Sequence, residues 1–482
     1  MKTPAPAQTL APVETPTPVR APAPATTAAP ATAPAPATTP APSKALAPAT
    51  TPTPVKAPAP VKTAAPATAP APVKAPAPSQ ALAPVRALVR RIEAGTPGHR
   101  DRAVDGLRAL ALLAVPTGHW LLGGFTLSAD GAIHNASPLA AFGALAPASW
   151  ILQMLGIFFL VGGYASALSF RRRTGTTRAW LGGRLARLGR PVLGVTAVWA
   201  ALLPLLHHGF GMPVDTLRTA STLVVQPLWF VGVYTVVTAL TPLCVRAARR
   251  FGVWAAAPLL GSVAVVDFLR YGPYADAVPS WLSLLNILPG WLFAYQLGTA
   301  WGEGRVNRRH AWGLLLGGAA LFAVLLLVFG YPSSMVGVPG EARTNSHPPS
   351  LLVLALAALQ SGAAILLRDR LGRWLRRPAL WAPVVVINLS AMTILCWHQT
   401  AMLAAAVPAS YLGEVPGLVG APDSVGWILA RLAWMPVFAG LLVLIGRYAR
   451  GFESPWARTG PARRALAGVL AAGFAVFALG LA

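Results

Sequence analysis

The sequence is poor in acidic residues and in charged residues of every kind. Asp and Glu together number 14 of 482 residues, and charged residues make up 11% of the chain. Soluble domains carry roughly 25% charged residues, so this deficit argues against a soluble fold. Hydrophobic residues make up 55% of the chain. A soluble protein could not bury that much apolar surface, which indicates that much of it faces lipid.

Cysteine and lysine are also scarce. The two cysteines, Cys244 and Cys396, lie in separate apolar runs. They give no basis for a disulfide framework or a metal site, and we interpret them as packing residues. We expect no bound metal and no permanently bound cofactor. Lysine occurs only near the N-terminus, at Lys2, Lys44, Lys56, Lys62 and Lys74.

Arginine therefore supplies most of the net charge of +25. The arginines form short clusters between apolar runs, whereas a nucleic-acid interface gathers basic residues on one face. We accordingly expect no nucleic-acid partner. Basic loops that alternate with apolar segments are typical of membrane proteins.

The first 85 residues contain little except Ala, Pro and Thr. Pro at every second or third position prevents a helix, and Ala and Thr cannot build a core. We predict a disordered, partly polyproline-II tail on the cytoplasmic side. The segment lacks the apolar region of a secretory signal.

Apolar runs of about 17–22 residues follow, each long enough to cross about 30 Å of hydrocarbon as a helix. We predict spans at 104–125, 148–169, 191–207, 222–243, 252–269, 281–301, 311–330, 350–367, 382–404 and 426–446. A further hydrophobic helix is expected at 462–482. The predicted fold is all-α: a polytopic membrane helix bundle of ten or eleven transmembrane helices, with its main domain over 100–450.

The loops predict the orientation of this bundle. Arginine clusters follow the second, fourth, sixth, eighth and tenth spans, whereas the loops 126–147 and 405–425 contain no Arg or Lys. Because cytoplasmic loops are enriched in basic residues, we expect the N-terminus in the cytoplasm. The predicted location is a bacterial plasma membrane, with the lipid bilayer as a partner.

The first predicted span carries unusual polar residues. Arg108 and His119 are eleven residues apart, which is about three helical turns, so they share a face about 16 Å apart along the helix. Asp105 lies one turn before Arg108 and can pair with it. Pro116 removes one helical hydrogen bond and can kink the helix near His119. A histidine within a span is a functional hypothesis by default.

Further arginines follow the second span. Gly162 and Gly163 allow close helix approach within that span. Planar guanidinium groups suit phosphate binding, but the same charges could serve membrane topology and contact lipid headgroups. The sequence leaves both interpretations open for Arg171, Arg172, Arg173, Arg184, Arg187 and Arg190.

Several of these features together resemble one family. The chain over about 100–450 is similar to the acyltransferase family 3 membrane proteins, which acylate hydroxyl groups. The resemblance rests on D-G-L-R at 105–108 with His119, Phe158-Phe159, R-L-A-R-L-G-R-P at 184–191, P-L-W-F at 227–230 and His398. The chain departs from the family where Gly162-Gly163 replaces a frequent Ser-Gly, so any hydrogen bond from that serine is lost.

The resemblance implies an acyl-CoA co-substrate on the cytoplasmic side. The acyl group, acetyl or another short one, would pass to a hydroxyl of a carbohydrate, lipid or secondary metabolite. His119 would act as general base or transient acyl carrier with Arg108 as its partner, and Asp105, paired with Arg108, is the third expected catalytic residue. Histidine suits this role because its pKa lies near neutrality. The donor would contact Arg171, Arg172, Arg173, Arg184 and Arg187.

Three further residues are expected to contact the acceptor. Trp229 could line a pocket or anchor the membrane interface. His398 is a second histidine within a span, and Asn345 lies in a polar outer loop that could also be an ordinary turn. A transporter or flippase is the main alternative function, although no clear inverted repeat is visible and few acidic residues lie within the spans.

Overall fold

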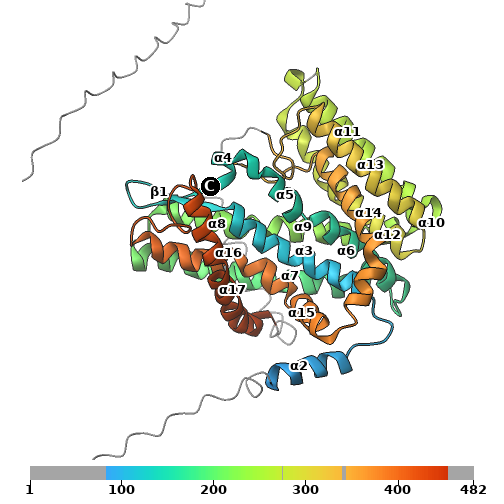
Figure 1. The fold of residues 1–482 in the computed structure, drawn as a ribbon, viewed down its shortest axis with the longest axis horizontal. Helices are drawn as coiled ribbons and strands as arrows, with labels where there is room; N and C mark the ends of the chain where they lie inside the picture. Colours follow the sequence, from blue (N-terminus) through green and yellow to red (C-terminus); the bar gives the residue numbers. More distant parts are fainter. Residues whose placement is uncertain (1–82, 274, 339–342, 454–482) are drawn as a thin grey trace, which may run out of the picture. The chain divides into compact units, whose positions relative to one another are not determined.

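The described part of the chain is almost entirely helical (Figure 1). The computed structural model describes residues 83–273, 275–338 and 343–453. Its helices are α2 (Ala83–Ala94), α3 (Arg102–Leu122), α4 (Pro138–Ala141), α5 (Ala146–Leu152), α6 (Leu155–Arg171), α7 (Thr177–Pro204), α8 (Val214–Val225), α9 (Leu228–Ala239), α10 (Thr241–Phe251), α11 (Ala257–Tyr271), α12 (Ile287–Gly302), α13 (Arg308–Leu327), α14 (Leu351–Trp374), α15 (Pro378–Leu389), α16 (Ala391–Ser410) and α17 (Val425–Glu453).

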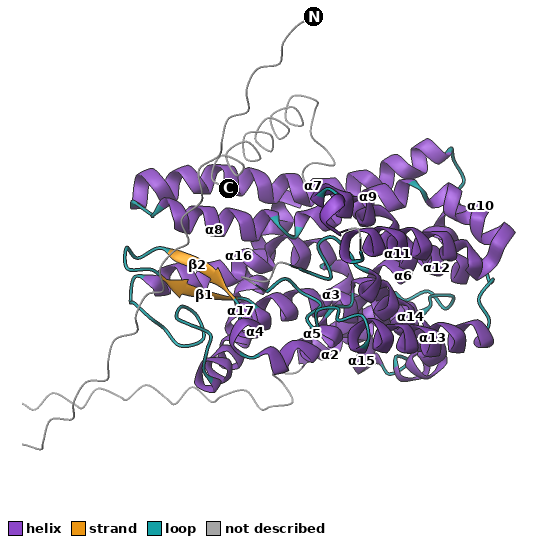
Figure 2. Ribbon diagram, turned by 90° about the horizontal axis from the view of Figure 1, so that it is seen from above, coloured by secondary structure: helices purple, strands orange, loops and turns teal. Residues whose placement is uncertain are grey.

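Short elements join some of these helices. They are the 3-10 turns η1 (Gly143–Leu145), η3 (Gly252–Ala256), η4 (Ala275–Ala277) and η5 (Ser280–Asn286), and the π turn η2 (Leu205–Gly209). Strands β1 (Gly124–Leu127) and β2 (Ile133–Ala136) form an antiparallel hairpin. Figure 2 shows this hairpin beside α8. The expected tail, apart from the start of α2, and the expected helix over 462–482 lie outside the described residues.

The structure supports a polytopic membrane protein, but it does not confirm ten spans. Seven helical segments of the described chain are long and apolar enough to cross a membrane, or eight if the bent pair α15–α16 counts as one. The predicted span 104–125 corresponds to α3, whose hydropathy is lowered by Asp105, Arg108 and His119. The predicted span 281–301 is divided between η5 and α12, and α12 has only 16 residues.

The predicted single helix over 382–404 is wrong. The chain forms α15 and α16 there, with an angle of 75° between them. The break lies at Ser390, whose backbone N–H donates to the carbonyls of Val386 and Ile387 and closes the last turn of α15. Both half-helices contact α3: Asn388 of α15 bonds to Arg108, and Gln399 of α16 bonds to His119.

The basic stretch after the fourth predicted span is also helical where a loop was expected. It forms most of α10, in which Val245 and Ala248 are buried while Arg249 and Arg250 are exposed. This spacing gives the stretch one apolar face that packs on the bundle. Burial of that face stabilises the helix despite the cluster of arginines on the other face.

Close helix contacts in the core depend on glycine, as predicted for the second span. A methyl group on Gly163 of α6 would overlap the backbone of Tyr295 in α12, and one on Gly298 of α12 would overlap the backbone of Leu160. The two helices can therefore approach to backbone contact, which is typical of helix pairs in membranes. Cys244 and Cys396 are both buried, as expected of packing residues.

Candidate active site

A cavity of about 330 Å³ surrounds the C-terminal end of α3. Its wall includes His119 from α3, Trp229 from α9, Gln399 from α16 and His347 from the loop before α14. The other polar side chains that line it belong to Asn135, Ser137, Gln153, Gln226, Thr344 and Ser346. Among the described residues, its lining contains no Asp, Glu, Lys or Arg. The cavity therefore suits an uncharged group with hydroxyls that can bond to amides and hydroxyls.

His119 lies at this cavity and its ring contacts that of His398, which is fully buried and does not line the cavity. The centres of their rings are 5.1 Å apart. The structure thus brings together two residues that the sequence placed on separate spans. Gln399, which sequence reasoning missed, adds a direct contact: its Nε2 lies 3.2 Å from Nδ1 of His119.

The hydrogen bonds of His398 define its tautomer. Its Nδ1 lies 3.1 Å and 3.0 Å from the carbonyl oxygens of Ile394 and Leu395. Carbonyl oxygens only accept, so Nδ1 must carry the proton and Nε2 of the neutral ring must carry a lone pair. That Nε2 is buried and has no hydrogen-bond partner among the described residues. A buried acceptor without a partner is rare in proteins and calls for a functional explanation.

Trp229 and His347 form another part of the wall. Their rings meet edge to face, with centres 4.7 Å apart. Surrounding protein atoms lower the pKa of the His347 imidazole, because desolvation disfavours the charged ring. Burial therefore favours the neutral ring of His347, in keeping with the uncharged lining of the cavity.

Asn345 does not line this cavity. Its side chain is buried and donates to the carbonyl oxygens of Pro332 (2.7 Å) and Ser334 (2.8 Å), and it accepts from the Ser350 hydroxyl. Through these bonds the Asn345 amide holds the loop before α14 together. The structure therefore gives Asn345 a supporting position behind the neighbouring Thr344, Ser346 and His347.

Arg108 and Asp105 lie toward the other end of α3. Asp101 caps that end by accepting a hydrogen bond from the backbone N–H of Val104. Arg108 pairs with Asp105 at 3.3 Å, as its spacing predicted, and its Nε donates to Oδ1 of Asn388 at 2.6 Å. Asn388 in turn donates to the Asp105 carbonyl at 2.9 Å. Because Asn388 is the penultimate residue of α15, these bonds tie α3 to the bend before α16.

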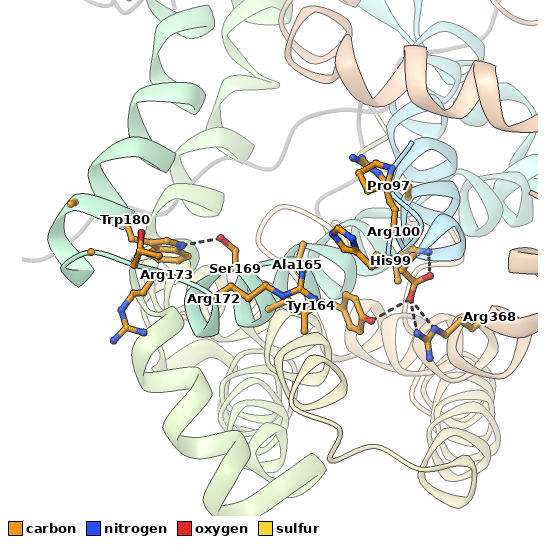
Figure 3. Close-up of a pocket in the computed structure, with 17 residues that line it drawn as sticks. Pro97, His99, Arg100, Tyr164, Ala165, Ser169, Arg172, Arg173, Trp180 and Arg368 are labelled. Carbon is orange, nitrogen blue, oxygen red and sulfur yellow. Dashed lines mark hydrogen bonds and ion pairs between the residues drawn. The ribbon is translucent and has the colours of Figure 1, made fainter. Parts of the chain in front are cut away.

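A second cavity, of about 900 Å³, opens beside this end of α3 (Figure 3). Its wall contains Arg172 and Arg173 at the end of α6, with Arg100 before α3 and Arg368 of α14. Arg100 and Arg368 are paired with carboxylates, at 2.6 Å from Asp105 and 2.7 Å from Asp101. In Figure 3 the Arg172 side chain runs toward Tyr164 and His99.

The other predicted donor arginines do not line this cavity. Arg184 turns into the bundle, where it donates to the Ser166 hydroxyl at 3.1 Å, lies over the Trp180 ring and interacts electrostatically with Arg108. Arg187 is exposed and bonds to the carbonyl of Gly183 in its own helix. Arg171 is exposed at the end of α6. Only Arg172 and Arg173 of the predicted set face the cavity.

Seven or eight helical segments of the described chain are long and apolar enough to cross a membrane, as in an integral membrane protein. Residues 101–449 match the family model described as an acyltransferase domain. The chain belongs to this family, acyltransferase family 3, which confirms the resemblance seen in the sequence. Searches of curated proteins and of solved structures gave no match. Family membership indicates acyl transfer within a membrane.

Proposed function

We propose that the protein is a membrane O-acyltransferase that moves an acyl group, acetyl or another short one, from acyl-CoA to a hydroxyl group. The observation that carries this proposal is the position of His119 on the wall of an uncharged cavity, on the same helix as an arginine-lined cavity. The first cavity fits an acceptor hydroxyl of a carbohydrate, lipid or secondary metabolite. The second fits the phosphates of coenzyme A.

In the proposed chemistry one proton passes from the acceptor hydroxyl to His119 and then to the leaving thiolate. The acceptor hydroxyl gives its proton to Nε2 of His119 while its oxygen attacks the thioester carbonyl, and the C–S bond then breaks. The leaving thiolate takes the proton back as free coenzyme A. This route needs a lone pair on Nε2, which is present when the Gln399 amide is turned so that its oxygen accepts from Nδ1–H of His119. Transfer of the acyl group first to the His119 ring is the second route that the same geometry allows.

In this proposal the donor approaches along α3. Arg172 and Arg173 bind phosphates at the mouth, and the long arm of the coenzyme passes Arg108 toward His119, about 16 Å further along the helix. Trp229 borders the acceptor, and His398 acts near the reacting atoms through its contact with His119. The test of the function is release of free coenzyme A coupled to ester formation, which a transporter or flippase would not produce.

Loss of the two cavity arginines should weaken donor binding. The double change Arg172→Gln and Arg173→Gln is expected to raise the KM for acetyl-CoA at least about tenfold, because each charge-assisted hydrogen bond contributes about 1.5–3 kcal/mol. The kcat should change little, since neither side chain reaches the reacting carbonyl. The measurement is initial rate against acetyl-CoA concentration in isolated membranes.

The matched control is the double change Arg308→Gln and Arg309→Gln, which removes two adjacent exposed arginines at the start of α13. It should leave the KM at the parental value. An equal rise in KM for both pairs would instead assign these arginines to lipid headgroups.

We also propose that the arginine-lined end of the bundle faces the cytoplasm of a bacterial plasma membrane and that ten helices span it, with the N-terminus inside. In a chain with Cys244 and Cys396 replaced by alanine, Asp130→Cys in the β1–β2 turn should react with an impermeant thiol reagent in intact cells. Arg370→Cys in α14 should react only after the membrane is permeabilised. The opposite pattern would reverse the orientation.

A further inference from the structure

Arg431 of α17 is a buried charge that the site described so far does not use. Its side chain is 1% exposed, and it lies in an otherwise apolar part of the chain. Among the described residues it forms no ion pair with a carboxylate; its hydrogen bonds go to backbone carbonyls and one thioether. A charge inside a membrane bundle is costly and usually marks a function.

The guanidinium group binds the end of the helix that carries His119. Its Nε donates to the carbonyl of Trp120 at 2.5 Å, and its Nη2 donates to the carbonyl of Gly123 at 2.7 Å. Both carbonyls belong to the C-terminal turn of α3, which lacks helical partners and carries the negative end of the helix dipole. Arg431 therefore acts as a cap supplied by a different helix.

The same group reaches two other segments that border the cavity region. Its Nη1 donates to the carbonyl of Gly417 at 2.8 Å, and its Nη2 contacts the sulfur of Met402 in α16 at 2.9 Å. One side chain thus joins the end of α3, the loop before α17 and the helix that carries His398. A lysine could replace it only in part, because its single ammonium lacks the planar fork that reaches several carbonyls.

Trp120 continues this connection to the histidine pair. Its indole N–H donates to the His398 carbonyl at 3.0 Å, while its ring packs on Phe438 of α17. Because Trp120 directly follows His119, fixing its carbonyl and its indole fixes the orientation of the His119 backbone. The contacts of the His119 ring with His398 and Gln399 depend on that orientation.

We propose that Arg431 is a positioning residue that, through Trp120, holds His119 against His398 and Gln399. The expected effect on kcat rests on the proposed function. The placement of the His119 ring can be measured without any activity. Arg431 itself does not line the cavity, but it bonds to Gly123 and Met402, which do. Its loss should therefore act through the placement of His119 and leave the donor cavity unchanged.

The test compares Arg431→Gln, Arg431→Lys and Trp120→Phe in the full chain. Arg431→Gln should lower kcat about tenfold, because it removes hydrogen bonds from a charged group. Arg431→Lys should lower kcat less. Trp120→Phe keeps the ring but removes the bond to His398, and should lower kcat about threefold, as expected for one interhelical hydrogen bond in a membrane. The KM for acetyl-CoA should stay constant and the pH dependence of kcat should shift, which a mere loss of folded protein would not produce.

The second measurement is the rate at which diethyl pyrocarbonate modifies His119, followed by mass spectrometry. The rate should rise in Arg431→Gln and Trp120→Phe, because the ring loses its fixed contact with Gln399. The control is Trp434→Phe in α17. This change removes an indole N–H that donates to the carbonyl of Pro416, in the loop before α17. It should leave both measurements at parental values.

Parental modification rates and pH profiles in both Arg431→Gln and Trp120→Phe would overturn the positioning role while leaving the proposed function intact. Absence of acyl transfer in the parental chain would overturn the proposed function. In that case the modification rates would still test whether Arg431 positions His119.

Discussion

Replacing His119 with alanine is expected to lower acyl transfer by about 10²–10⁴-fold, because this is the usual contribution of a general base. Expression and membrane insertion should stay near parental values, since alanine enters a bilayer more readily than histidine does. The lost contact with Gln399 should reduce stability only slightly, as interhelical hydrogen bonds in membranes average about 0.6 kcal/mol. The measurement is transfer of labelled acetyl from acetyl-CoA, normalised to the amount of inserted protein.

The matched control is His208→Ala, which makes the same substitution at an exposed histidine after α7 that does not line the cavity. It should keep parental activity. A His119→Ala protein that inserts normally and transfers acyl groups at the parental rate would remove the catalytic role of His119.

The second large effect is expected at Arg108. Arg108→Ala should lower activity about tenfold to a hundredfold, since it removes charge-assisted hydrogen bonds to Asn388 and Asp105 that contribute about 1.5–3 kcal/mol. The bend before α16 would then lose its connection to α3. Arg108→Lys should restore activity only in part, because one ammonium cannot reproduce both bonds. The measurement is kcat and KM for acetyl-CoA in membranes with equal amounts of each variant.

Asn388→Ala provides an independent test of the same connection, because it removes the partner of Arg108 and leaves the charge in place. It should also lower activity, by less than Arg108→Ala. If Arg108→Ala lowers activity while Asn388→Ala has no effect, Arg108 acts on the donor directly and the bend is not involved. Parental activity in Arg108→Ala would contradict both roles.

The sequence predicted the features that depend on local spacing. Asp105, Arg108 and His119 lie within one helix, so their pairing and separation follow from helical geometry. Close helix approach at Gly163 and the burial of both cysteines could be predicted from residue type within an apolar run, but the partner helix α12 could not. The number of spans was harder to predict, because α3 and α12 depart from the apolar length on which such predictions rest.

Features that depend on contacts between helices could not be predicted in this way. The bend at Ser390 arises where α15 ends, and it brings Asn388 to Arg108 and Gln399 to His119. Asn345 looked available in the sequence, but its amide is used within its own loop. Arg431 was a visible signal that went unused, since an arginine within an apolar run is itself a functional hypothesis.

The most direct test of the central claim uses the parent strain and a strain that lacks this chain. Whole lysates of each, with their membranes, are incubated with acetyl-CoA labelled in the acetyl group, and alkali-labile labelled esters are measured by mass spectrometry. We expect the parent to form an ester that the deletion strain lacks, that the wild-type chain restores and that His119→Ala does not restore. Identical labelled esters in the parent and deletion strains would contradict the account.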